Sequence, residues 1–137
     1  MCNNNQDCKC MAEILTVINI LQQNAECGDS CLDTCDRGFL GCSASSINCN
    51  TRPITLYIGG SNTPWEMPIS RDPEIETTST VFRIEKIDGC CATFRVLAPN
   101  TEMGATYPYV STNSFFTVNL NCVCALRCLQ DTYIECI

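Results

Sequence analysis

The stretch TVFRIEKIDGCCATFRVLA, residues 80–98, decides the fold because it places two strand-like runs on either side of an Asp-Gly pair. Both runs are rich in β-branched and aromatic residues, which suit the half-buried surface of a sheet. Asp88-Gly89 suits a tight two-residue turn, since glycine readily adopts the positive φ that such turns need. We therefore predict an antiparallel hairpin made of residues 80–87 and 90–98.

Side chains alternate across a strand, so the second run of this hairpin has two distinct faces. Ala92, Phe94 and Val96 share one face, which is apolar and predicted to point into a core. By the same alternation, Cys90 should point inward and its neighbour Cys91 outward.

The rest of the chain from Asn50 onward has the same β character. Glycine-, proline- and aspartate-containing breakers separate the strand-like runs, which also include 53–59, 114–129 and 132–136. Residues 101–109 show no clear pattern. The predicted class is mainly β: an antiparallel β-sandwich over residues 50–137, with an N-terminal amphipathic helix and a cysteine-rich arm.

The arm comprises residues 1–49, and its residues 10–25 carry apolar side chains at i, i+3, i+4 and i+7. This spacing predicts one amphipathic helix. We expect the helix to pack on the domain's own core, with binding of a partner as the alternative. The predicted stripe is Met11, Ile14, Leu15, Ile18, Leu21 and Ala25, widened by Val17 and Ile20. The arm and the sandwich should form one structural unit, because 137 residues is the usual size of one domain.

Cysteine is the exceptional residue, at 14 of 137 positions, a density typical of disulfide-rich proteins. The start, MCNNNQDCKC, shows neither a signal peptide nor a transmembrane segment, which predicts synthesis in the cytosol. Disulfides are rare in that reducing compartment. Three explanations stay open: thiolates that bind metal, a secreted binding domain whose leader was removed, or a cytosolic product that is oxidised later.

Position along the chain suggests a role for each cysteine. If residues 114–129 form one regular strand, the cysteines at 122, 124 and 128 share its apolar face, toward the core or an opposing sheet. We expect one or two of them, with Cys90, to pack as buried thiols. Cysteines near the chain ends, with the outward-facing one, can reach other molecules. The candidates for intermolecular disulfides are therefore Cys2, Cys8, Cys10, Cys91 and Cys136. The candidates for intramolecular disulfides or buried thiols are Cys27, Cys31, Cys35, Cys42, Cys49, Cys90, Cys122, Cys124 and Cys128.

No catalytic site stands out. The chain has no histidine and no C-x-x-C pair, which excludes a Cys–His nucleophile and removes the thioredoxin-type signature. Some cysteines have the x3 spacing that zinc sites permit, so a zinc-thiolate module is the alternative function. We predict no enzyme activity, no cofactor and no metal ligand. The net charge of −7 leaves no basic patch for phosphates or anionic lipid, so neither nucleic acid nor membrane is an expected partner.

Three stretches resemble blocks of the CotY/CotZ/ExsY family of spore coat and exosporium proteins from endospore-forming bacteria. They are NTRPITLY (50–57), VFRIEKIDGCCATFRVL (81–97) and VSTNSFFTVNLNCVCALRCL (110–129). The last is the most specific, because C-x-C-A-[IL]-x-C-L is an unusual string. Together the blocks cover about a third of the chain, in the family's order.

The resemblance implies a structural protein that self-assembles into homo-oligomers, hexamers among them. These would tile into two-dimensional layers around the endospore that disulfides make insoluble. It also implies other coat or exosporium proteins as partners and the spore surface as the location. Such proteins are made without a leader in the mother-cell cytosol and meet an oxidising environment once that cell lyses, which would explain the cysteine content.

Overall fold

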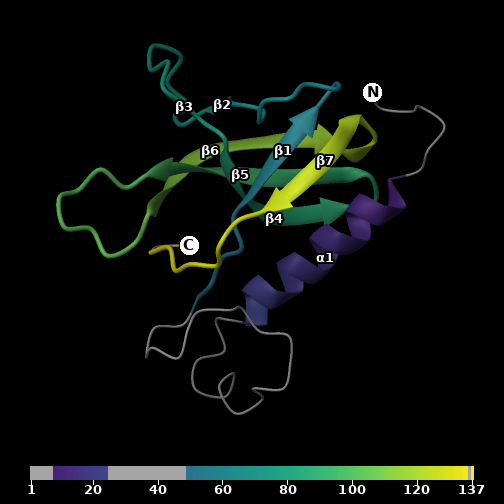
Figure 1. Ribbon diagram of the computed structural model, residues 1–137, viewed down its shortest axis with the longest axis horizontal. Coiled ribbons are helices and arrows are strands. Elements are labelled where there is room, and N and C mark those ends of the chain that lie inside the picture. The colour runs from purple at the N-terminus through teal and green to yellow at the C-terminus, as the bar shows by residue number, and fades with distance from the viewer. Residues whose placement is uncertain (1–7, 25–48, 136) are drawn as a thin grey trace.

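The computed structural model describes residues 8–24, 49–135 and 137. Five strands form one antiparallel sheet in the order β6-β5-β4-β1-β7, and β2 pairs with β3 in a second, small sheet (Figure 1). The elements are α1 (Lys9–Asn24), β1 (Ile54–Ile58), β2 (Met67–Pro68), β3 (Thr78–Ser79), β4 (Val81–Asp88), β5 (Cys91–Pro99), β6 (Tyr109–Asn119), the 3₁₀ helix η2 (Leu120–Cys122) and β7 (Val123–Cys128).

The predicted hairpin is confirmed as the pairing of β4 with β5, which runs from Val81 opposite Leu97 to Asp88 opposite Cys91. The two residues between the paired ends are Gly89 and Cys90. The turn therefore lies one residue later than the predicted Asp88-Gly89. Gly89 has a φ of 60°, a conformation that glycine adopts without strain, so the glycine has the role that the prediction gave it.

The large sheet curls into two facing layers. Its edge strands β6 and β7 are joined by only the three residues of η2, although four strand spacings, about 19 Å, would separate them in a flat sheet. The register of β1 with β4 is a single pair, Ile54 opposite Phe82, and the β1–β7 ribbon crosses in front of β4, β5 and β6 (Figure 1). The predicted mainly β class with an N-terminal helix is therefore confirmed.

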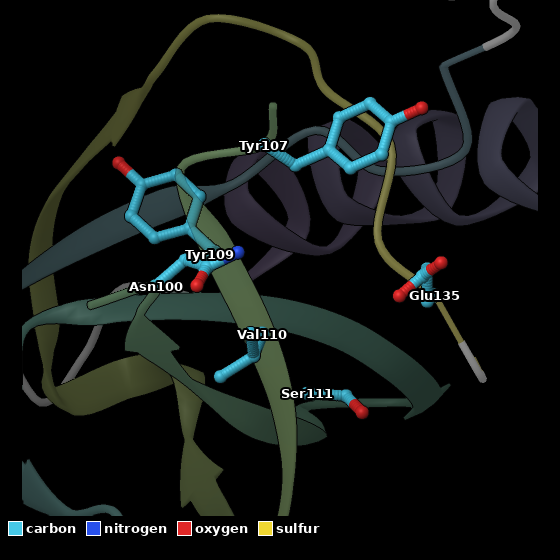
Figure 2. A pocket seen from close by; sticks show the side chains of 6 residues that line it. All are labelled: Asn100, Tyr107, Tyr109, Val110, Ser111 and Glu135. Atoms are coloured by element: carbon cyan, nitrogen blue, oxygen red, sulfur yellow. The ribbon is translucent and has the colours of Figure 1, made fainter. Parts of the chain in front are cut away.

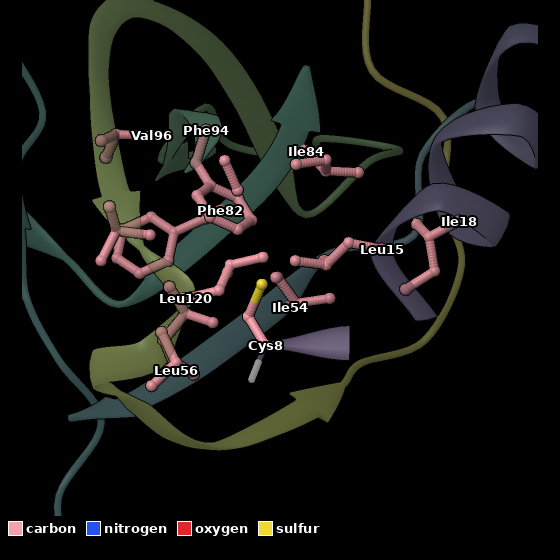
Figure 3. Packing of buried hydrophobic residues seen from close by; sticks show 13 residues of the cluster. Cys8, Leu15, Ile18, Ile54, Leu56, Phe82, Ile84, Phe94, Val96 and Leu120 are labelled. Carbon is pink, nitrogen blue, oxygen red and sulfur yellow. The ribbon is translucent and has the colours of Figure 1, made fainter. Parts of the chain in front are cut away.

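The apolar faces of these layers enclose one core, which α1 closes on one side (Figure 3). On another side Trp65 packs edge-on against Phe116 and Phe82, with ring centroids 5.1 and 6.4 Å away. Ser114 Oγ donates to the Pro68 carbonyl at 2.7 Å and ties β6 to the small sheet. The helix and the strands thus share a single core, built from Cys8, Leu15, Ile18, Ile54, Leu56, Phe82, Ile84, Ala92, Phe94, Val96, Val118, Leu120 and Val123.

The helix is confirmed, but its buried face differs from the predicted stripe. Leu15 and Ile18 are buried, whereas Ile14 is 41% exposed and Gln22 is only 1% exposed. The Gln22 Nε2 donates to the Ile84 carbonyl at 2.9 Å, and its Oε1 accepts from the Arg52 backbone N–H at 3.0 Å. Gln22 follows Leu15 and Ile18 on the same helix face. An amide can satisfy two buried backbone groups at once, so a polar residue occupies this buried position, which the predicted apolar stripe does not include.

The predicted strand 114–129 is wrong as one element, because η2 interrupts it. The Asn119 side chain accepts from the Asn121 N–H at 3.0 Å, and the Leu120 N–H donates to the Cys90 carbonyl at 2.8 Å. These bonds end β6 and redirect the chain into β7. The predicted strand 132–136 is also wrong: its observed sheet contact is one bridge between Thr51 and Thr132.

The outer face of β4 and β5 carries a partly buried charge cluster centred on Glu85. This residue is the extra residue of a β-bulge between Ile84 and Lys86. Its Oε2 accepts from Arg83 Nη1 and from Arg95 Nε, both at 2.9 Å. Arg83, 5% exposed, also donates from Nε to Thr51 Oγ1 at 2.9 Å. One carboxylate therefore bridges two arginines on adjacent strands.

We expect Glu85→Ala to lower the free energy of unfolding by about 2 kcal/mol, because it leaves Arg83 buried without its carboxylate. Glu102→Ala, which removes an exposed carboxylate, should change it by less than about 0.5 kcal/mol. Urea unfolding of both variants measures the two values. Equal midpoints for the two variants would contradict the role given to Glu85.

Candidate functional site

Cys8 and Cys90 form a disulfide across 82 residues, with their Cα atoms 5.7 Å apart. Cys8 directly precedes α1 and lies among Leu15, Ile54 and Leu120 in the core (Figure 3). The bond therefore fastens the start of the helix to the β4–β5 turn. The assignment of Cys8 to intermolecular disulfides is wrong, because packing of α1 carries this cysteine into the core instead of leaving it at a loose end.

Two free, exposed thiols flank this bond, those of Cys10 and Cys91. Cys10 is the second residue of α1, and Cys91 is the first residue of β5, opposite Asn119 of β6. Each lies within two residues of a bonded cysteine, so both thiols belong to the same end of the molecule. Cys91 points outward, as the strand alternation predicts.

The predicted burial of one or two of Cys122, Cys124 and Cys128 is wrong, since all three are exposed. The 3₁₀ helix breaks the alternation at the first of them. In β7, Val123 pairs with Ile58 but Ala125 pairs with Tyr57, so Cys124 is the extra residue of a bulge. Cys128 lies opposite the buried Ile54, but β7 is an edge strand and leaves this thiol open to solvent.

The surroundings of Cys128 raise its pKa above that of an ordinary thiol. Partial burial is the largest cause, the positive charge of Arg52 lowers the pKa, and the negative charge of Asp131 raises it. Arg52 and Asp131 form a two-point ion pair, with Nε to Oδ1 at 2.8 Å and Nη2 to Oδ2 at 2.9 Å. The thiolate is the reactive form, so a raised pKa makes Cys128 less nucleophilic at a given pH.

We expect Arg52→Gln to slow alkylation of Cys128 by iodoacetamide near pH 8 and to move the pH midpoint of that reaction upward. The variant removes the positive charge that lowers the pKa of Cys128. Arg127→Gln is the matched control, because Arg127 adjoins Cys128 but is not among the causes of its pKa shift. Mass spectrometry of the labelled peptide gives the rates. Equal slowing by both substitutions would show that Arg52 has no special effect.

The remaining predicted cysteines are only partly accounted for. Cys49 is buried and disulfide-bonded. Within residues 8–24 and 49–135, no group of three or more Cys, Asp or Glu side chains is placed to hold a metal ion. Cys2, Cys27, Cys31, Cys35, Cys42 and Cys136 lie outside the described residues.

A pocket of about 200 Å³ lies at the other end of the β5–β6 pair from Cys91 (Figure 2). The rings of Tyr107 and Tyr109 point away from each other there, and Tyr107 packs on Tyr133 with centroids 5.2 Å apart. No sequence pattern indicates this pocket, because a third of its lining comes from the patternless stretch 101–109 and Glu135 comes from the end of the chain. It is lined by Asn100, Tyr107, Tyr109, Val110, Ser111 and Glu135.

Of the helices that the structure describes, none has the length and apolar character to cross a membrane.

Comparison with known proteins identifies the family. Neither the curated proteins nor the solved structures contain a match to this chain. The family model for spore coat protein Z matches residues 1–107, which include α1, the Cys8–Cys90 disulfide and the β4–β5 hairpin. This match covers most of the sequence and shows that the chain belongs to the spore coat protein Z family, a structural family of the spore surface.

Proposed function

We propose that this protein is a self-assembling building block of the spore coat or exosporium. Copies associate into ordered layers around the endospore, and disulfides between exposed cysteines join neighbouring copies. The observation that carries the proposal is the exposure of three free thiols, those of Cys10, Cys91 and Cys128, on a domain whose Cys8–Cys90 pair is already bonded.

The thiols of Cys91 and Cys128 are too far apart to bond to each other within one chain. Cys91 pairs with Asp88, at one end of β4, whereas Cys128 pairs with Ile54, which in turn pairs with Phe82 near the other end. Six residues of strand separate those two positions, about 20 Å. A disulfide requires Cα atoms within about 7 Å, so bonds from Cys91 and from Cys128 must reach other cysteines.

Free, exposed thiols at both ends of the molecule suit continuous assembly. An interface that joins different surfaces of neighbouring copies closes into rings or continues as an open array, whereas a two-fold interface stops at a pair. Hexameric rings that tile into a lattice, with other coat proteins as further partners, are the arrangement that we expect. Synthesis in the mother-cell cytosol would keep these thiols reduced until the protein meets oxidant.

The test is gel electrophoresis of purified protein with and without reductant, followed by negative-stain microscopy of both samples. We expect a ladder of high-mass species that collapses on reduction, and ordered sheets or rings in the oxidised sample. A variant with Cys10, Cys91 and Cys128 changed to serine should fold, lose most of the ladder and assemble into particles that detergent dissolves without reductant. A wild-type protein that is monomeric in both lanes and forms no particles would overturn the proposal.

The zinc-thiolate module makes the opposite prediction for reduced protein. Stoichiometric zinc in the purified reduced chain, together with loss of its β-sheet circular dichroism on addition of a chelator, would replace the proposed function with metal binding.

A further inference from the structure

We propose that the outward flank of α1 pairs, in parallel, with the α1 of a second copy, and that a Cys10–Cys10 disulfide locks this pair. The inference rests on the proposed function, because it names one of the contacts by which copies associate. It also identifies which residues of the helix are responsible.

The first observation is an apolar surface on a helix that already buries another face. Ile14, Val17 and Ile20 are 41%, 56% and 50% exposed, while Leu15 and Ile18 fill the core. These three exposed β-branched side chains form a surface for association, because burying them against a partner gains roughly 25 cal/mol for each Å² of apolar area.

The second observation is that the Cys10 thiol belongs to the same surface. Cys10, Ile14, Val17 and Leu21 follow one another at spacings of four, three and four residues. Alternating spacings of four and three residues are those of the a and d positions along which two helices pack in a coiled coil. We call these four residues the outer seam. Cys10 is free and exposed, and stands at the N-terminal end of the seam.

A second copy of the chain is the partner that fits best. The outer seam contains no charged residue, so two chains that each carry a net charge of −7 can approach there without bringing like charges together. A partner with the same seam offers apolar residues at matching spacing and a matching thiol. Residues 25–48, which follow α1, are the other possible cover, but they are mostly small and polar and contain few large apolar side chains.

The area of the seam explains why a covalent bond is needed. Four side chains on one helix flank bury on the order of a few hundred Å², well short of the roughly 1,200 Å² of a stable specific interface. The helix pair alone is therefore weak. A disulfide at its end makes the contact persist.

The thiol also selects the orientation. In a parallel, in-register pair the two copies of Cys10 face each other across the seam. In an antiparallel pair centred on Val17 they would be about 21 Å apart, since each lies seven residues from the centre at 1.5 Å per residue. Only the parallel arrangement brings them within disulfide distance.

The bond needs an oxidant, for which we name a small-molecule disulfide such as oxidised glutathione. One Cys10 thiolate attacks this disulfide, forms a mixed disulfide and releases one glutathione thiolate. The Cys10 thiolate of the second chain attacks the mixed disulfide and releases the other. The two cysteine protons end on the two glutathione thiols, so the chains are oxidised by two electrons and the glutathione is reduced by two.

The experiment uses the full-length protein, reduced and then equilibrated in a glutathione redox buffer. Cleavage after Lys9 by trypsin and after Glu13 by Glu-C releases Cys10 in the four-residue peptide 10–13. Two copies of this peptide joined by a disulfide can come only from two chains. We expect the self-linked peptide in wild-type protein and its absence from Cys10→Ser.

Two lysine substitutions on the same helix test the seam. Val17→Lys places a charge in the seam and should reduce the self-linked peptide at least about tenfold. Gln23→Lys, at an exposed position outside the seam, should reduce it less than about twofold. Thermal unfolding should be alike for both variants, because neither position belongs to the core.

Two results would overturn the inference: equal amounts of self-linked peptide in the two lysine variants, or a melting temperature lowered by Val17→Lys alone. The second would mean that the chain itself covers the seam. Microscopy keeps the proposals distinguishable. Cross-linked layers without the self-linked peptide would refute the helix pairing and leave the proposed function standing. A cross-linked dimer that never forms particles would support the helix pairing and refute the proposed function.

Discussion

Cys90→Ser is expected to lower the free energy of unfolding by about 4–5 kcal/mol, the largest effect that we expect from a single cysteine. The Cys8–Cys90 bond closes a loop of 82 residues, and a long closed loop restricts the unfolded chain strongly. The bond also fastens α1, so its loss should loosen the helix before the sheet unfolds. Reduction of the wild-type protein should lower the free energy of unfolding at least as much, because it also breaks the disulfide of Cys49.

Cys91→Ser is the matched control, since it changes the adjacent residue, whose thiol is free and exposed. It should alter the free energy of unfolding by less than about 0.5 kcal/mol. Urea titration followed by the fluorescence of Trp65, the lone tryptophan, gives both values. If the two serine variants unfold at the same urea concentration, the Cys8–Cys90 disulfide does not stabilise the fold.

Phe82→Ala should destabilise the protein by about 3–5 kcal/mol, because it opens a cavity at the centre of the core. The Phe82 side chain is fully buried and packs against Phe116 at 4.8 Å and Phe94 at 6.3 Å between ring centroids. It also links β1 to β4 through its pairing with Ile54. Its ring therefore fills the space where the two layers meet, and its removal should leave a void there while the backbone pairing stays.

Phe115→Ala removes the same side chain from the surface and serves as the control. Phe115 is 46% exposed and lies under the Arg95 guanidinium, with 4.6 Å from Cζ to the ring centroid. Loss of this cation–π contact should cost about 0.5–1 kcal/mol. Urea midpoints measure both costs, and Trp65 emission should shift to longer wavelength only in Phe82→Ala. A cost for Phe82→Ala close to that of Phe115→Ala would show that the core repacks around the missing ring.

Local features of the chain were predictable because their causes are local. The turn between β4 and β5 depends on the backbone freedom of one glycine, Gly89, and the two strands depend on alternation over eight or nine residues. The helix follows from apolar spacing over four turns. The outward direction of Cys91 needed only the alternation within its own strand.

The predictions from the sequence were wrong where contacts with other parts of the chain decide the local structure. A 3₁₀ helix of three residues cancels the alternation that would bury Cys122, and a bulge places Cys124 outside the strand register. The 3₁₀ helix depends on hydrogen bonds to a capping side chain and to the distant Cys90 carbonyl. Gln22 lies on the same helix face as Leu15 and Ile18, but a search for apolar residues passes over it, because its burial depends on hydrogen bonds to two backbone groups.

The sequence by itself determined that the protein is mainly β, begins with a helix, has cysteine in excess and resembles spore coat proteins. Which cysteines bond and which stay at the surface was decided by the tertiary structure alone. Cys8 and Cys90 are 82 residues apart and meet because α1 packs on β4, while Cys10, two residues along the same helix, faces solvent. Composition and spacing describe each segment separately, whereas a disulfide depends on the distance between segments, and packing sets that distance.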